Sequence, residues 1–470
     1  MSLILPANSL TGGYEIDNSL RFNSGSNDYL SKTYGTNGDR RLWTFSTWVK
    51  RSDAGTAGQF LLGSGDSTPR ETSIYFVNNS FQIEYYTGAN YYLRTSAVYR
   101  DVSAWYHLVA VWDTDNATSS ERLRLYVNGE RITSFSSEVY PPINLDSFIN
   151  STLTPMEIGR YWNNSNYFNG YMSETYFIDG QALSPTDFGE FDQDTGIWIP
   201  KKYTGTYGTN GFYLDFENSG SLGADQSGNG NNWTVNNLTS IDQVTDSPTN
   251  NFCTFNPLSI NNNTSQNYGT FSEGNLKFIG NSATNNANSF STIGFTKGKW
   301  YMEFKITGNL SHYPNIGIVP LRTFQRTNGA SGQVGSDADS FSYRATGVKT
   351  TGGVDYSYGD SFTTNDIIGV AVDLDNGAIY FSKNGTWQNS GVPESGASKT
   401  GVAFSFTPYD EEYFFAVSVY QSSSGLESNF GNPPFTISSG NSDANGYGNF
   451  EYSVPSGYYA LNNKNLANYG

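Results

Sequence analysis

The chain has 470 residues, enough for two or three domains, and carries a formal net charge of −17 with an isoelectric point near 4.5. This charge repels nucleic-acid phosphates and anionic lipid headgroups, so we expect neither as a partner. The single cysteine, Cys253, excludes an intrachain disulfide and the disulfide-stapled class of secreted scaffolds, and we expect it to be a buried small hydrophobic residue.

The composition predicts an all-β protein. Only 36% of the residues are hydrophobic, yet 16% are aromatic, including 34 Tyr and 31 Phe. Aromatic residues suit short strands with one wet side, whereas Gly, Asn, Ser and Thr build the turns between them. No long window shows the 3.6-residue periodicity of a helix.

The start of the chain, residues 1–13, holds a three-residue apolar run before Pro6, which is too short for the core of a signal peptide. No stretch approaches the ~20 apolar residues of a membrane span. We therefore expect synthesis in a cytoplasm and no membrane insertion.

Residues 14–200 read as one block of short strands with turn signals every 8–12 residues, as in a sandwich. Within it, WYHLVAVWDTDNATSSERLRLYVNGERI (105–132) predicts a hairpin that is followed by a turn at Asn128-Gly129. Near the end of the block, Ser184 and Pro185 predict a single helical turn, as N-cap and first helical residue.

Residues 201–250 are rich in Gly, Asn, Ser and Thr and contain one strand-like piece at 212–216. This break predicts a linker with a short strand between two domains, and the sequence leaves open whether that strand belongs to a sandwich. The hexapeptide TYGTNG occurs at 33–38 and again at 206–211, which indicates chance or a shared loop type rather than a solenoid.

Residues 251–470 form a second β block that contains IIGVAVDLDNGAIYFSKNGTW (367–387). Asn376-Gly377 lies between two β-rich runs and predicts a hairpin with a tight type I′ turn. Asn384-Gly385 predicts a second turn, which leads to Trp387.

Several motifs of the first block occur in the same order as in a known family. They are WTFSTWVK (43–50), WYHLVAVWD (105–113), LRLYVNGE (123–130) and IGRYWNNSNYFNGYMSETYFIDGQALSPTDF (158–188). Residues 1–200 resemble the laminin-G-like members of the concanavalin A-like lectin/glucanase superfamily. The resemblance implies a jelly-roll sandwich of two antiparallel sheets.

The second block, residues 251–470, resembles SPRY domains. The matching segments are KWYMEFKITG (299–308), IGI (316–318), DIIGVAVDLDNGAIYFSKNGTW (366–387) and NFGNPPF (429–435). The resemblance implies a second bent sandwich whose loops bind partners without catalysis. The expected fold class is therefore all-β, with two concanavalin-like sandwiches joined by a Gly/Asn/Ser-rich segment.

Two further segments, GYEIDNSLRFN (13–23) and FYLDFENSGSLGADQSGNGNNWTVNN (212–237), resemble virion proteins of tailed bacteriophages of the marine type. The resemblance implies a non-catalytic virion protein: a tail fibre, a tail-associated adhesin or a capsid protrusion. Its implied partners are other virion proteins and a host-surface glycan, with homo-oligomers in the particle. The alternatives are a purely structural decoration protein and a polysaccharide depolymerase.

The acidic segment Glu190-Phe-Asp192-Gln-Asp194 resembles the catalytic strand of glycoside hydrolases in the same superfamily. The strand is broken at once by Thr-Gly, so we interpret it as an acidic exit loop. Of the two histidines, His107 lies in an apolar hairpin and His312 in a loop without a Ser or Cys partner. We therefore expect no catalytic residues.

Sugar recognition is expected from aromatic side chains beside amides and carboxylates, because sugars stack on rings and hydrogen-bond through their hydroxyls. The best candidates are Trp162, Asn163 and Asn164 in the first block, where turn-forming Asn residues flank the indole. Further candidates, some of which must face the core, are Tyr85, Tyr86, Tyr91, Tyr92, Tyr356, Tyr358 and Trp387.

No cofactor is expected, but calcium is left open. Asp225, Ser227 and Asn229 offer oxygen ligands in a Gly-permitted loop. The segment resembles an Asp-x-Ser-Gly-x-Gly motif of laminin-G-like domains, some of which bind calcium. It departs from that pattern because Ser173-Glu174 stands where an Asp is frequent.

Overall fold

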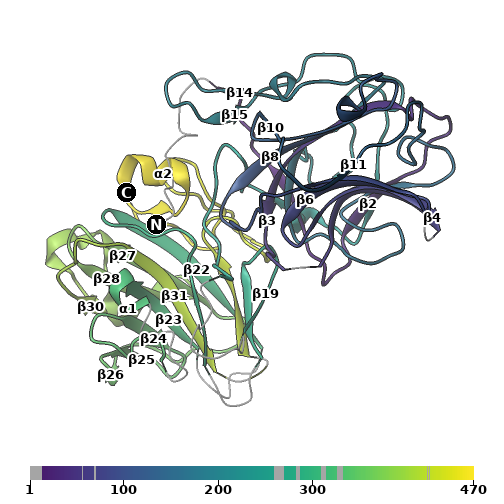
Figure 1. The fold of residues 1–470 in the computed structure, drawn as a ribbon. Coiled ribbons are helices and arrows are strands. Elements are labelled where there is room, and N and C mark those ends of the chain that lie inside the picture. Colours follow the sequence, from purple (N-terminus) through teal and green to yellow (C-terminus); the bar gives the residue numbers. More distant parts are fainter. Residues whose placement is uncertain are drawn as a thin grey trace. The chain divides into compact units, whose positions relative to one another are not determined.

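The computed structural model describes residues 13–55, 57–67, 70–258, 269–281, 286–308, 314–324, 332–420, 422 and 424–470. The chain divides into two compact units, one running to Asn250 and the other from Asn251 to Gly470. Each unit is a β-sandwich (Figure 1). Within the described ranges, no helix is long and apolar enough to cross a membrane.

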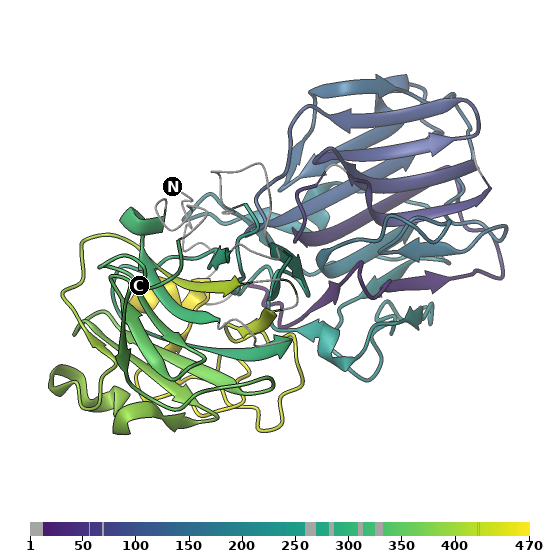
Figure 2. The same ribbon diagram turned by 90° about the horizontal axis from the view of Figure 1, so that it is seen from below.

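The first unit has two main eight-stranded sheets, whose strands lie side by side in Figure 2. The β3 sheet has the order β10-β9-β8-β3-β13-β1-β18, with β16 beside β13, and the β5 sheet has the order β11-β7-β6-β5-β4-β12-β2-β17. Strands of the β3 sheet are β1 (Ser19–Phe22), β3 (Leu42–Arg51), β8 (Trp105–Asp113), β9 (Leu123–Val127), β10 (Glu130–Arg131), β13 (Gly170–Asp179), β16 (Phe212–Leu214) and β18 (Gln243–Val244). Strands of the β5 sheet are β2 (Tyr29–Lys32), β4 (Gln59–Ser67), β5 (Arg70–Val77), β6 (Ser80–Tyr86), β7 (Asn90–Thr95), β11 (Phe135–Val139), β12 (Met156–Ile158) and β17 (Thr234–Asn236). Outside these sheets lie the hairpin of β14 (Gly189–Phe191) and β15 (Trp198–Pro200) and the single turns η1 (Ser119–Glu121), η2 (Pro185–Asp187) and η3 (Ser240–Asp242).

Aromatic side chains fill the space between the two sheets of the first unit. Trp43 and Trp112 stack with ring centroids 6.0 Å apart, and Tyr85 of the opposite sheet lies 5.9 Å from Trp112. All three rings belong to one continuous buried cluster. The predicted hairpin of β8 and β9 is confirmed, and Asn128-Gly129 turns with positive φ at both residues, 48° and 83°.

Residues 201–250 do not form the expected linker. They belong to the first unit and contribute β16, which pairs with β13, β17, which pairs with β2, and β18, which pairs with β1. Each of these strands has only two or three residues, so the sequence of this region resembles a loop. The three strands are nevertheless part of the two sheets of the first unit.

The two TYGTNG copies lie against each other. The Tyr34 hydroxyl donates to the Asn210 carbonyl (2.8 Å), and the Asn210 side-chain amide donates to the Thr36 carbonyl (2.9 Å). Asp179 joins them: its carboxylate accepts hydrogen bonds from the backbone N–H of Asp39 (2.7 Å) and of Asn210 (3.0 Å). The repeat is therefore a pair of loops held by one buried carboxylate.

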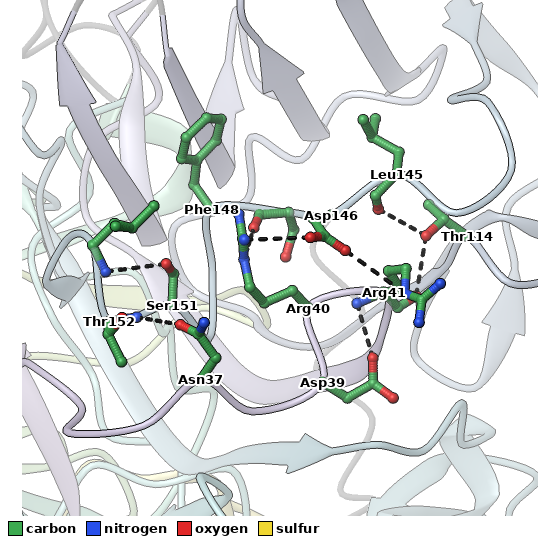
Figure 3. A network of polar contacts seen from close by, with 12 residues as sticks. Asn37, Asp39, Arg40, Arg41, Thr114, Leu145, Asp146, Phe148, Ser151 and Thr152 are labelled. Carbon is green, nitrogen blue, oxygen red and sulfur yellow. Dashed lines mark hydrogen bonds and ion pairs between the residues drawn. The ribbon is translucent and has the colours of Figure 1, made fainter.

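The neighbouring loops carry a surface network (Figure 3). Arg40 Nε donates to the Ser147 carbonyl (2.8 Å), and Asp146 forms ion pairs with Arg40 (3.4 Å) and Arg41 (3.6 Å). The Asp146 side chain is 53% exposed, so these pairs are screened by solvent and contribute little stability.

We predict that Asp179→Asn destabilises the first unit by about 2 kcal/mol or more, because an amide in this position replaces a charge-assisted acceptor of three hydrogen bonds. Asp146→Asn is the matched control and should change stability by less than about 1 kcal/mol. Urea unfolding of both variants measures the difference. Equal effects would show that burial of Asp179 confers no special stability.

The second unit also has two sheets. The β22 sheet has the order β19-β20-β32-β22-β27-β28-β29, with β30 beside β28 and β33 parallel to β22; the β23 sheet has the order β21-β31-β23-β24-β25-β26. Strands of the β22 sheet are β19 (Gly269–Ser272), β20 (Lys277–Gly280), β22 (Lys299–Gly308), β27 (Ile367–Asp373), β28 (Ala378–Lys383), β29 (Thr386–Trp387), β30 (Phe404–Ser405), β32 (Ser424–Asn429) and β33 (Tyr459–Ala460). Strands of the β23 sheet are β21 (Asn286–Phe290), β23 (Asn315–Pro320), β24 (Phe341–Arg344), β25 (Val348–Thr351), β26 (Val354–Ser357) and β31 (Tyr413–Tyr420). Short helical pieces are α1 (Leu321–Phe324), η4 (Gln388–Ser390), η5 (Pro393–Ser398) and α2 (Asn463–Tyr469). Cys253 is buried, as predicted.

The hairpin predicted in 367–387 is present, but its first turn differs from the prediction. Asp373 pairs with Ala378, so the loop has four residues, and of its Asn376-Gly377 pair only Gly377 has positive φ. The Asp373 carboxylate explains the difference, because it accepts hydrogen bonds from both the backbone and the side-chain amide of Asn376 (3.0 and 2.8 Å). The two-residue turn with positive φ at both positions is Asn384-Gly385.

A buried carboxylate also holds the C-terminal part of the second unit. Glu303 of β22 accepts the backbone N–H groups of Glu451 (2.9 Å) and Tyr452 (2.8 Å), and the side chains of Tyr301 (3.0 Å) and Asn429 (3.1 Å). Burial raises the pKa of Glu303 to about 7, although these hydrogen bonds oppose the rise.

We predict that the second unit loses stability as pH rises from about 4.5 to about 7. The folded state binds the Glu303 proton more tightly than the unfolded chain, so the stabilisation is complete below the unfolded pKa and lost as pH rises through the folded pKa. Glu303→Gln should flatten this dependence. Hydrogen exchange of β22 amides between pH 5 and 8 measures the pH dependence of stability. Glu174→Gln, in the first unit, is the control and should leave the second unit unchanged. If stability depends on pH as steeply in Glu303→Gln as in the wild type, Glu303 is not the group responsible.

Candidate functional site

The outer face of the β5 sheet carries polar and aromatic side chains, because successive side chains of a strand point to opposite faces. Ile74 and Phe76 of β5 lie in the core, so Glu71, Ser73 and Tyr75 lie on the opposite face. Ser73 is fully buried there, and its hydroxyl has no hydrogen-bond partner among the residues that the structure describes.

The next two strands extend this face. β6 contributes Gln82, Glu84 and Tyr86, and β7 contributes Tyr92 and Arg94. Gln82 pairs with Arg94 across the strands, and Glu84 pairs with Tyr92. Glu84, Tyr86, Tyr92 and Arg94 are all half-exposed, so ring faces and charged groups reach solvent together.

The loop between β12 and β13 folds onto this face. Trp162 packs on Gly65, where an added Cβ would lie only 2.7 Å from the indole Cδ1. The indole Nε1 donates to Glu71 Oε2 (2.8 Å), and the ring of Tyr161 lies 5.5 Å from that of Trp162. Gly65, which leaves room for the ring, and the buried carboxylate of Glu71 thus position the Trp162 indole on the sheet.

A chain of hydrogen bonds crosses the strands beside Trp162. Arg94 Nε donates to Gln82 Oε1 (2.5 Å), Gln82 Nε2 donates to Glu84 Oε2 (2.7 Å), and the Tyr75 hydroxyl donates to the same oxygen. Within the described ranges no hydrogen bond to Glu84 Oε1 occurs. We call this surface the Glu84 face; its members are Glu71, Glu84, Tyr86, Tyr92, Arg94, Tyr161 and Trp162.

The two carboxylates of the Glu84 face differ in environment. Burial raises the pKa of Glu71 above its usual range, the negative charge of Glu84 adds to the rise, and hydrogen bonds from Tyr161 and Trp162 oppose it. Glu71 is only 7% exposed, whereas Glu84 is open to solvent on one side. Such a surface can bind hydroxyl groups and apolar ring faces at once.

The predicted residues of the first block fall partly on this surface. Trp162 lies on it, while Asn163 and Asn164 are exposed at the tip of its turn, where Asn164 has φ of 63°. The four strand tyrosines divide between the two sides of the sheet: Tyr85 and Tyr91 pack towards the core, and Tyr86 and Tyr92 belong to the Glu84 face.

The three predicted residues of the second block do not form one site. Tyr358 packs with Phe381 on the inner side of the β22 sheet, and Trp387 packs with Tyr301 on its outer side. Tyr356 lies on the edge strand β26 and is 48% exposed.

In the loop predicted to bind calcium, the side-chain oxygens of Asp225 already accept hydrogen bonds from the chain itself. Both carboxylate oxygens of Asp225 accept hydrogen bonds, from the N–H groups of Tyr213, Ser227 and Asn231 and from the Ser227 hydroxyl. The Asn229 amide donates to two backbone carbonyls. N–H and O–H groups that point at the Asp225 carboxylate occupy the positions that a cation would need. The described part of the chain also holds no cluster of three His, Cys, Asp or Glu residues that could hold a metal ion.

The acidic segment at 190–194 lies in the exposed β14–β15 hairpin. Glu190 is exposed, and Asp192 accepts hydrogen bonds from the N–H of Asp194 (3.2 Å) and from the N–H and hydroxyl of Thr195 (2.8 and 2.7 Å). The segment thus runs from strand β14, where Glu190 pairs with Ile199, into the turn of a two-stranded hairpin outside the two main sheets.

His107 is an interior residue. Its Nδ1 accepts the Trp198 indole N–H (3.0 Å), its Nε2 lies 2.9 Å from the Ser46 hydroxyl, and burial lowers its pKa to about 3. His312 lies outside the described residues.

Sequence reasoning missed Glu71, Glu84, Arg94 and Tyr161. A signal for Glu84 is present, because FQIEYY places a carboxylate between two core residues of a strand. The Glu71–Trp162 contact joins residues 91 positions apart and has no local signal.

Comparison with known proteins identifies both units by type. Residues 24–187 match the family model of the concanavalin A-like lectin/glucanases superfamily, and residues 299–433 match that of the SPRY domain. The chain carries a laminin-G-like, concanavalin A-like domain followed by a SPRY domain. The Glu84 face lies within the first matched range.

Individual relatives cover only parts of the chain. It is 30% identical over 145 residues to the ATP-dependent RNA helicase DDX1 of Xenopus laevis, a stretch that spans 31% of this chain and 17% of the helicase. Similar solved structures are the SPRY domain of human HERC1 (19% identity, 33% of this chain, 87% of that chain, TM-score 0.25) and a human SPRY domain (16%, 36%, 98%, TM-score 0.27). Stonustoxin is a third (17%, 38%, 27%, TM-score 0.27).

Proposed function

We propose that the protein binds a glycan, without turning it over, through the Glu84 face of its concanavalin A-like domain. The observation that carries this proposal is the meeting of half-exposed rings with an open carboxylate on one sheet surface. Sugars stack their C–H faces on such rings and donate their hydroxyls to carboxylates. Tyr86, Tyr92, Tyr161 and Trp162 supply the rings, and Glu84 supplies the acceptor.

The sheet holds these groups in a fixed arrangement before any ligand arrives. Glu84 and Arg94 are cross-linked through Gln82, and Trp162 is fixed through Glu71. Side chains that are already ordered lose little conformational entropy on binding, which favours affinity from a small contact surface.

We further propose the setting of a tailed-bacteriophage virion, where a tail fibre, tail-associated adhesin or capsid protrusion attaches to a host-surface glycan. The support is the sequence resemblance of residues 13–23 and 212–237. In this setting the SPRY domain contacts other virion proteins, and the chain assembles as a homo-oligomer in the particle.

A glycan array probed with the full chain tests the binding proposal. Trp162→Ala and Tyr92→Ala should each weaken binding roughly tenfold, because each removes a stacking surface. Tyr356→Ala is the matched control, since it removes an exposed strand tyrosine from the other unit. Circular dichroism checks that the variants fold.

Two outcomes would count against the proposal. One is an array without any bound glycan; the other is equal binding by Tyr92→Ala and Tyr356→Ala. Release of reducing ends from a bound polymer would instead show a depolymerase, with Glu190→Gln and Asp192→Asn testing the acidic hairpin.

A further inference from the structure

Two carboxylates lie close together on the Glu84 face. Glu71 pairs with Tyr86, and Ser73 pairs with Glu84, so Glu71 and Glu84 are diagonal neighbours on adjacent antiparallel strands. Such neighbours have backbones about 7–8 Å apart. Their charges interact, since Glu84 raises the pKa of Glu71.

Among the described residues, no ion pair neutralises either carboxylate. In the described ranges, Lys and Arg form ion pairs with other acids but not with Glu71 or Glu84. Arg94 is the cation of the Glu84 face, and its Nε is bound to Gln82 rather than to an acid. The contrast is Glu157 on the same sheet, which Arg160 pairs through two contacts of 2.6 and 2.8 Å.

The open oxygen of Glu84 sets the chemistry of its ligand. An ionised carboxylate only accepts hydrogen bonds, so the ligand group that meets Oε1 must be a donor: a hydroxyl or an ammonium. A ligand carboxylate at this oxygen would meet the carboxylate of Glu84 directly, and like charges brought together at an interface cost several kcal/mol.

We propose that the Glu84 face selects its glycan by charge: it accepts neutral and amine-bearing sugars and rejects sugars that carry uronic or sialic carboxylates. The inference rests on the proposed glycan-binding function. Glu84 is the selecting group because it is the half-exposed member of the pair, while Glu71 is buried and holds the Trp162 indole.

The test is an array with neutral, amine-bearing and carboxylate-bearing versions of the same sugars, probed with the full chain. The wild type should bind the carboxylate-bearing versions roughly tenfold or more weakly than the neutral versions. In Glu84→Gln, the affinities for the neutral and the carboxylate-bearing versions should differ by no more than about threefold. The reason is that the amide removes the charge but keeps the shape of the side chain.

Glu190→Gln is the matched control. It removes one negative charge from an exposed hairpin and gives the same net charge as Glu84→Gln, so it separates an effect of this face from the general repulsion by an acidic protein. It should bind like the wild type. Raising the salt concentration to about 1 M, where the Debye length is about 3 Å, should also reduce the difference between the wild-type affinities for neutral and carboxylate-bearing sugars.

The outcomes separate the two proposals. Neutral and carboxylate-bearing sugars bound equally by the wild type, or a preference unchanged in Glu84→Gln, would overturn charge selection and leave glycan binding intact. An array with no bound sugar would overturn both.

Discussion

The register in which β5 pairs with β6 controls the chemistry of the first unit. Ile74 and Ile83 lie opposite each other in the core. Because side chains alternate across a sheet, a slip of one residue in this pairing would invert one of the two strands and turn either Glu71 or Glu84 into the aromatic interior. Burying unpaired charge there is so costly that the core itself enforces which side chains reach solvent. The proposed binding face is therefore a by-product of packing on the other side of the sheet.

Both units use a buried carboxylate to hold a segment that arrives late in the chain. Asp179 accepts the backbone N–H of Asn210, and Glu303 accepts those of Glu451 and Tyr452. A buried carboxylate on an inner strand satisfies several backbone donors of an irregular segment at once. This explains how loops rich in Asn, Gly and Ser keep fixed positions without strands of useful length.

The sequence predicted those features whose cause is local. The hairpins, the Asn-Gly turns at 128–129 and 384–385 and the two-sided use of the strand tyrosines follow from neighbouring residues. The linker prediction for 201–250 was wrong because strands of two or three residues acquire their identity only from distant partners, as β18 does from β1. The turn at 374–377 differs because Asp373 offers its neighbours an acceptor that turn statistics ignore. The pairing of Glu71 with Trp162 depends on the folded sheet, so only the indole could be singled out beforehand.

The strands supplied by residues 201–250 bear on where the first domain ends. The family match stops at residue 187, but β17 covers one side of β2 and β18 covers one side of β1. A recombinant fragment cut at the end of the match would leave both strands with unsatisfied N–H and C=O groups facing solvent. Exposed edges of this kind recruit strands from other molecules, so the shortened domain would aggregate where the domain extended to residue 250 stays dispersed.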